Sequence, residues 1–201
     1  MLNAARPPRV AGVVLLALAS AVPAAADPLP APPADSNVFV LGGPFTSGYF
    51  GDAFLLWQDH YETNAFLGVG YQHFLYRHGS FQFGLEAGAG IRLGSPASLE
   101  LWTGGVARLT RFTFGDLTIT PALTAGFSLV TDTIGAETAR AARAGEDATV
   151  LYYLGPEIAF SSATEPQWEA FARIQHRSGG FGTIAHLDGS NAVTLGLRYK
   201  F

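Results

Sequence analysis

The stretch "SFQFGLEAGAGIRLG", Ser80 to Gly94, alternates apolar residues with polar or small ones along its whole length. Its odd positions are all apolar, and its even positions hold Gln82, Glu86, Arg92 and glycines. Successive side chains of a β-strand point to opposite faces, so this pattern predicts a strand with one apolar and one polar face. Both soluble sandwiches and membrane barrels are built from such strands.

Loop lengths distinguish these two folds. The chain has eight alternating segments, which are Val38–Trp57, Asn64–Tyr76, Ser80–Leu93, Ser98–Arg111, Asp116–Thr131, Thr149–Ser161, Gln167–Arg177 and Ser190–Phe201. Tight connections such as "RHG" alternate with connections that include the two longest, "DTIGAETARAARAGEDA" and "SGGFGTIAHLDG". Membrane barrels have short periplasmic turns and longer outer loops. The sequence therefore predicts an all-β protein, an eight-stranded antiparallel transmembrane (outer-membrane) β-barrel over residues 36–201, with both termini in the periplasm.

The polar faces of these segments carry charges of both signs. An eight-stranded barrel has an interior that side chains just fill, so we expect a hydrogen-bonded plug rather than a channel. Three aromatic residues, Trp57, Tyr61 and Trp102, suit the interfacial girdles of such a barrel. The residues expected in the plug are Gln82, Glu86, Arg92, Glu100, Arg108, Glu157, Glu169, Arg173, Gln175, Arg198 and Lys200.

The N-terminal region has the pattern of a secretory signal. Arg6 and Arg9 precede the apolar run Val10–Val22, and small residues follow it. This run is shorter than the roughly 20 residues that a membrane-spanning helix needs, which disfavours a membrane anchor. The sequence predicts a cleaved signal peptide over residues 1–26 and a Pro-rich extended linker over 27–35.

Composition excludes several classes of function. The chain has no cysteine, so thiolate metal sites and disulfides are ruled out, and its net charge of -4 gives no basic surface for nucleic acid. Asp59, His60 and Glu62 could in principle bind a metal, but such residues in an outer loop are more often simply hydrated. We expect no metal, no cofactor and no nucleic-acid partner.

Two His-x-Ser pairs occur, and their locations differ. His78 and Ser80 lie in a tight periplasmic turn, where solvated polar residues are ordinary. His176 and Ser178 lie at the outer end of the seventh segment and share the parity of its apolar, outward-facing residues. A polar side chain facing lipid has a substantial cost in free energy. The second pair is therefore the candidate for chemistry.

A third polar group is expected beside this pair. Asn191 has the outward parity of the eighth segment and lies at the same end, whereas Asp188 would face inward if the strand continued to it. Asn191 therefore ranks first as the group that orients the His176 ring, and Asp188 second. Serine, histidine and an orienting group form an acyl-transfer set, in which Gly179 and Gly180 are weaker candidates for backbone donors to the oxyanion.

The segments "QHRSG" and "GSNAVTLGLRYKF" resemble the PagL-type lipid A 3-O-deacylases, which are eight-stranded outer-membrane enzymes. Those enzymes hydrolyse the acyl ester at position 3 of lipid A with serine as nucleophile, histidine as base and glutamate as third member, without a metal. The resemblance implies these roles for Ser178 and His176 in a Gram-negative outer membrane. It departs at Asn191, which stands at the glutamate position, and at Gly179, where the family has asparagine.

The C-terminal segment "AVTLGLRYKF" also resembles the last strand of Gram-negative outer-membrane barrels, whose final aromatic residue, here Phe201, is read by the barrel assembly machinery. Partners implied by these resemblances are lipid A or lipopolysaccharide in the outer leaflet and the assembly machinery. The alternative is a non-catalytic barrel of the structural or adhesin kind, whose outer loops carry the function.

Overall fold

A computed structural model of the chain describes residues 34–56, 60–110 and 112–201. The predicted signal peptide, and the predicted linker up to residue 33, lie outside these residues. The fold is built from antiparallel strands, which are β1 (Ser36–Thr46), β2 (Tyr61–His78), β3 (Phe81–Leu93), β4 (Ser98–Leu109), β5 (Phe112–Phe114), β6 (Leu117–Val130), β7 (Val150–Ser162), β8 (Trp168–Ser178) and β9 (Asp188–Lys200).

Strand pairing closes the sheet into a barrel. Neighbouring strands pair in sequence, β9 returns to pair with β1, and β4 pairs with β6. Among the described residues, the short strand β5 pairs only with the start of β6, and the hairpin that these two segments form extends beyond the barrel wall. The predicted eight-stranded antiparallel barrel is confirmed, since closure leaves none of its eight wall strands with an open edge.

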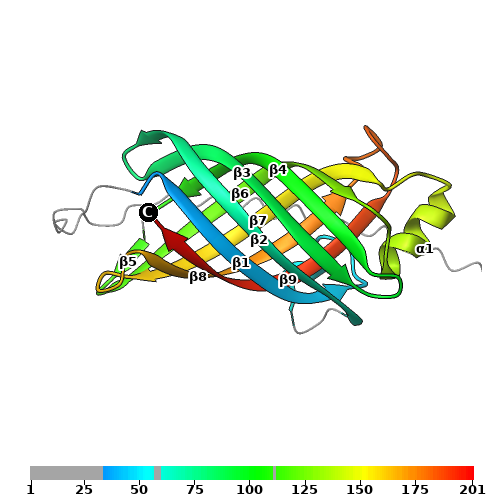
Figure 1. Cartoon of the computed structure of the whole chain (residues 1–201), viewed down its shortest axis with the longest axis horizontal. Coiled ribbons are helices and arrows are strands. Elements are labelled where there is room, and N and C mark those ends of the chain that lie inside the picture. The colour runs from blue at the N-terminus through cyan, green and yellow to red at the C-terminus, as the bar shows by residue number, and fades with distance from the viewer. Residues whose placement is uncertain (1–33, 57–59, 111) are drawn as a thin grey trace, which may run out of the picture. The chain divides into compact units, whose positions relative to one another are not determined.

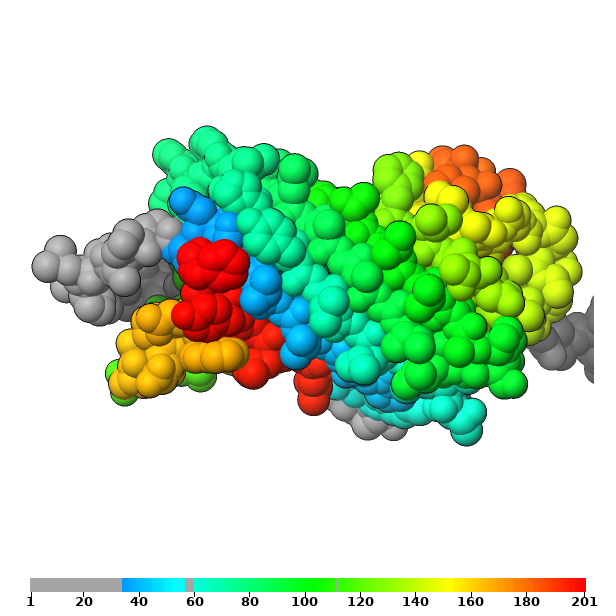
Figure 2. All heavy atoms as spheres, in the orientation of Figure 1, coloured from blue at the N-terminus to red at the C-terminus, as the bar shows by residue number. Residues whose placement is uncertain are grey.

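The two ends of the barrel differ. The C-terminus and β5 lie at one end, and the helix α1 (Gly135–Ala144) lies at the other (Figure 1). By the loop-length rule for outer-membrane barrels, the end with the tight turns is periplasmic and the α1 end is the outer one. Strands β3, β2, β1 and β9 run side by side across one face of the molecule (Figure 2). Within the described residues, neither helix is long and apolar enough to cross a membrane.

Charged side chains fill the interior. The structure buries most of the predicted plug, with Gln82 and Lys200 only partly covered near the periplasmic end. Arg173 lies at its centre, where its guanidinium contacts Glu86 at 2.6 Å and Glu157 at 2.7 Å. The buried members are Glu86, Arg92, Glu100, Arg108, Glu157, Glu169, Arg173, Gln175 and Arg198. The predicted plug is therefore confirmed.

Trp102 belongs to this interior and not to a girdle. Its side chain is 3% exposed, and its indole N–H donates to Glu86 over 2.8 Å. The girdle prediction was wrong for Trp102 because its neighbours Leu101 and Thr103 face outward, which turns Trp102 inward by the two-residue period. Tyr61 is exposed at the start of β2, and Trp57 lies outside the described residues.

Two segments at the outer end differ from the sequence prediction. Strand β1 ends at Thr46, so the first predicted strand was too long, and Asp52–Phe54 form the short helix η1. We call residues 47–56 loop 1. The long connection after β6 contains α1, whose buried Glu137 accepts hydrogen bonds from Arg177 and Arg92 and so continues the plug into the outer end.

Candidate active site on the outer wall

His176 lies on the outer face of the barrel wall, as predicted. Its strand neighbours Gln175 and Arg177 both point into the interior, where Gln175 accepts a hydrogen bond from the hydroxyl of Tyr153 and Arg177 donates to Glu137. The alternation of β8 therefore turns His176 outward. Yet its side chain is only 5% exposed, because loop 1 covers it.

The orienting group on the imidazole is Asn191. Strand pairing places Asn191 directly opposite His176, and its Oδ1 lies 2.7 Å from Nδ1 of the ring. An amide oxygen only accepts, so it holds the proton of the neutral ring on Nδ1. Nε2, which makes no hydrogen bond within the described residues, is then left with its lone pair and can act as a base.

Asp188 also faces outward, contrary to the sequence expectation. The pairing of β8 with β9 shifts between Arg177 and Ser178, so that Ser178 lies opposite Asp188 and Gly189 is the extra residue of a β-bulge. The bulge reverses the parity of the strand before it. Asp188 Oδ1 consequently lies 3.7 Å from Nδ1 of His176, and this oxygen is buried without a hydrogen-bond partner in the described part of the chain.

Glycine at position 189 is required by close packing. A Cβ built there would lie 2.8 Å from the backbone oxygen of Arg177 and 2.8 Å from the side chain of Leu151. Real Cβ atoms do not approach backbone this closely, so a larger residue would force the bulge open. The position of Asp188 thus depends on Gly189.

Loop 1 folds over the imidazole. The Phe50 ring stacks on the His176 ring with centroids 4.1 Å apart and an interplanar angle of 28°. The backbone N–H of Phe50 donates to Asp188 over 2.9 Å, and the amide of Asn191 donates to the backbone oxygen of Gly48 over 3.0 Å. Both residues that flank the imidazole therefore also hold the loop.

Arg140 joins loop 1 to the bulge. This α1 residue is 8% exposed and donates to the backbone oxygens of Ser47 and Gly48 at 2.8 Å each and of Gly189 at 2.9 Å. Its guanidinium also lies 4.8 Å from the centroid of the Tyr49 ring. Arg140, a buried cation in the connection between β6 and β7, thus holds both loop 1 and the start of β9.

Ser178 lies one row further out than His176 on the same face. Its side chain is partly exposed, and its hydroxyl makes no hydrogen bond to the described residues. Of the two predicted oxyanion donors, Gly179 uses its N–H to bond the Leu187 oxygen at 2.9 Å, which removes it from that role. The N–H of Gly180 has no such backbone partner within the described residues, so it is the remaining candidate donor.

Sequence reasoning missed Phe50, Arg140 and Gly189. Phe50 fell within the overlong first strand, and Arg140 within a connection read only as a loop. The one local signal was the glycine beside Asp188, since an isolated glycine in a strand pattern often marks a bulge.

Comparison with known proteins identifies the fold. Neither a protein-family model nor a curated protein sequence matches the chain. The crystal structure of the outer-membrane enzyme PagL is similar, with a TM-score of 0.56 and 10% identity over 82% of this chain and 99% of that one. Neisserial surface protein A is also similar, with a TM-score of 0.52 and 11% identity over 85% of this chain and 100% of that one.

These two neighbours share an architecture, and the choice between catalysis and another role rests on the site described above. Their likeness, together with the closed barrel, makes this chain an eight-stranded β-barrel of the Gram-negative outer membrane.

Proposed function

We propose that the protein is an outer-membrane serine esterase that removes an ester-linked acyl chain from lipid A, at the 3-O position. The observation that carries the proposal is the outward-facing row of His176, Asn191 and Asp188 beside Ser178. A structural strand has no need of a buried imidazole on its outer face that is hydrogen-bonded to an amide and flanked by a carboxylate, because polar groups are costly there. Lipid A reaches such a site laterally from the outer leaflet.

The residues divide the chemistry as follows. Ser178 Oγ attacks the ester carbonyl carbon while its proton passes to Nε2 of His176, and His176 returns that proton to the departing lipid hydroxyl. Water then attacks the acyl-serine with His176 again as base, which releases the fatty acid and restores Ser178. The N–H of Gly180 is the proposed donor to the oxyanion.

Two residues share the work that a single glutamate does in the resembling family. Asn191 fixes the tautomer of His176, and its N–H₂ holds the Gly48 oxygen, which a carboxylate could not do because it has no donor. Asp188 supplies the negative charge, 3.7 Å from Nδ1, that stabilises the imidazolium formed during attack. The asparagine at position 191 therefore does not argue against catalysis.

The proposal is tested by the mass profile of lipid A from cells that express the protein. We expect wild-type protein to remove one hydroxyacyl mass from lipid A, and Ser178→Ala to leave lipid A intact at equal abundance in the outer membrane. An unchanged profile with the wild type would refute the esterase and favour the surface-barrel alternative. Loss of the same mass with Ser178→Ala would show that another nucleophile acts.

The charge of Asp188 has its own test. Asp188→Asn keeps an acceptor for the Phe50 N–H but removes the charge, so we expect kcat for acyl release to fall about 10- to 100-fold with KM nearly unchanged. This loss is smaller than the factor of about 10⁴ seen when a triad aspartate is replaced and the histidine takes the wrong tautomer. In Asp188→Asn the tautomer of His176 is kept, because Asn191 still holds the ring. An equal rise in KM would instead indicate that loop 1 had moved.

Arg140 is expected to act by positioning loop 1. Arg140→Met removes three hydrogen bonds to backbone oxygens, so amide hydrogen exchange in residues 47–50 should accelerate, and the hydrolysis rate should fall about tenfold. The matched control is Arg143→Met on the exposed side of the same helix. Unchanged exchange in Arg140→Met would contradict the role.

A further inference from the structure

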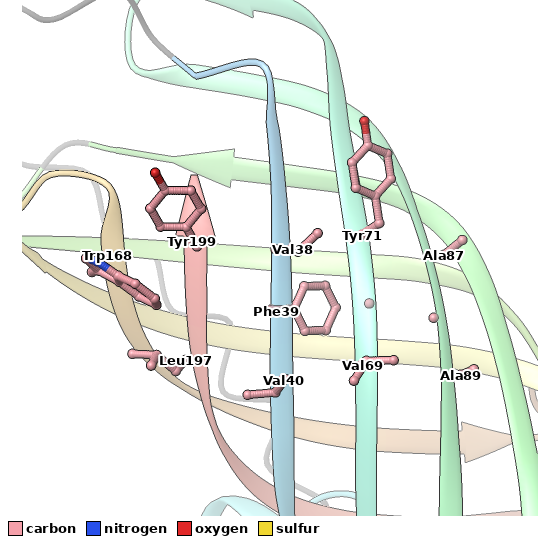
Figure 3. Close-up of a pocket in the computed structure, with 12 residues that line it drawn as sticks. Val38, Phe39, Val40, Val69, Tyr71, Ala87, Ala89, Trp168, Leu197 and Tyr199 are labelled. Atoms are coloured by element: carbon pink, nitrogen blue, oxygen red, sulfur yellow. The ribbon is translucent and has the colours of Figure 1, made fainter. Parts of the chain in front are cut away.

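An apolar groove with a volume of about 780 Å³ lies on the outer face of the wall, away from His176. The small residues Ala87 and Ala89 on β3 make its floor. They pair with the larger Tyr71 and Val69 on β2, which rise beside them. Figure 3 shows Val38 and Val40 between Val69 on one side and Leu197, Tyr199 and Trp168 on the other. Its volume is within the range of about 300–1,000 Å³ typical of small-molecule sites.

The groove belongs to the periplasmic half of the wall. Val38 and Val40 are near the start of β1, Leu197 and Tyr199 near the end of β9, and Trp168 begins β8. The outer face of these strands borders the hydrocarbon core of the bilayer, so at this depth an occupant is surrounded by acyl chains. The inner leaflet of an outer membrane consists of phospholipid.

A polar trio, Ser36, Tyr71 and His73, closes the periplasmic end of the groove. Ser36 lies opposite His73 in the pairing of β1 with β2, one outward-facing position beyond Val38 and Tyr71. The Ser36 hydroxyl lies 2.9 Å from the Tyr71 hydroxyl and 2.9 Å from Nδ1 of His73. Ser36 is thus the middle member, and the side chains of Tyr71 and His73 are exposed on the outer face.

This hydrogen-bonded chain always leaves a donor at one end. When Tyr71 donates to Ser36 and Ser36 to His73, the ring proton is on Nε2 and points away from the trio. When the chain runs the other way, the Tyr71 O–H is left over. Either donor fits an ester or phosphate oxygen of a lipid whose acyl chain lies in the groove below.

We propose that this groove binds a single phospholipid of the inner leaflet, with one acyl chain over Ala87 and Ala89 and its glycerol-phosphate region at the polar trio. The site is independent of His176 and Ser178, and it would hold phospholipid whether or not the protein is an esterase. Burial of one acyl chain along the small-residue floor supplies the affinity. The trio adds a hydrogen bond to the glycerol-phosphate region, which lipids elsewhere around the barrel do not receive from it.

The test is native mass spectrometry of the protein after reconstitution into phosphatidylethanolamine and phosphatidylglycerol vesicles and transfer to detergent. We expect one phospholipid retained per chain. The double variant Ala87→Phe/Ala89→Phe fills the groove and should lower retention at least about tenfold, the effect of losing two buried methylenes. His73→Leu leaves the groove open and should lower retention less.

Ala125→Phe is the matched control, since Ala125 is exposed on the outward face of β6, on another part of the wall. It should retain phospholipid as the wild type does. The proposal is overturned if the wild type retains none, if Ala125→Phe loses as much as the double variant, or if a second copy of the chain occupies the groove. A shift in SDS gel mobility between unheated and heated samples checks that each variant is folded. Lipid A hydrolysis by the double variant should equal that of the wild type.

Discussion

Purified protein carrying His176→Ala is expected to hydrolyse the acyl ester of lipid A at least about 10³-fold more slowly than the wild type. In the proposed mechanism His176 is the base for both half-reactions, so its removal would leave Ser178 as an ordinary alcohol, and only binding and the oxyanion donor would still contribute. The fall should appear in kcat rather than KM, because the imidazole is covered by Phe50 and held by Asn191 instead of lying free to bind lipid. Release of fatty acid from lipid A in mixed micelles measures both constants.

His78→Ala is the control for that experiment. His78 also precedes a serine by two residues, but it lies at the periplasmic end of β2, beside the Gly79 turn and at the opposite end of the barrel from His176. Its loss should leave the rate unchanged. If His78→Ala and His176→Ala lowered the rate equally, the effect would come from the stability of the barrel, and the assignment of His176 as base would be wrong.

The barrel followed from the sequence because its strands obey a two-residue period over their whole length. Each wall strand presents an apolar face to lipid and a polar face to the interior, so a local pattern reports a global property. The ends of strands carry no such signal. The apolar and aromatic residues of loop 1 resemble strand residues, so the pattern carries the first predicted strand past Thr46. In the structure Phe50 instead stacks on His176, and Phe54 packs edge-on against Phe50.

The same two-residue period predicted one part of the site. Parity placed His176 and Asn191 on one face, and strand pairing brought them together. Parity failed for Asp188, because the bulge at Gly189 inserts one residue and reverses every side chain beyond it. Arg140 could not be assigned either, since its partners are backbone oxygens far apart in sequence, and a backbone acceptor has no sequence signature.

Arg173 is expected to be the most destabilising position in the plug. Its guanidinium is buried and contacts both Glu86 and Glu157, and Glu86 also accepts hydrogen bonds from Trp102 and Thr124. Arg173→Met leaves the buried Glu86 without an ion pair among the described residues and leaves Glu157 with Arg198 alone. Such a loss typically costs about 3–5 kcal/mol, so the unfolding free energy in urea, followed by tryptophan fluorescence, should fall by that amount.

Arg77→Met provides the comparison, because Arg77 pairs with Asp35 at the periplasmic end, where the Asp35 side chain is 67% exposed. Exposed pairs contribute about 0–1 kcal/mol, so this variant should unfold nearly as the wild type does. Adding Glu86→Gln to Arg173→Met should recover part of the loss, since it removes the carboxylate that loses its ion pair, whereas Glu157 keeps Arg198 at 2.8 Å. If Arg77→Met and Arg173→Met were equally stable, the plug would contribute no more than a surface ion pair, and the barrel would owe its stability to the strand ladders and the lipid-facing surface alone.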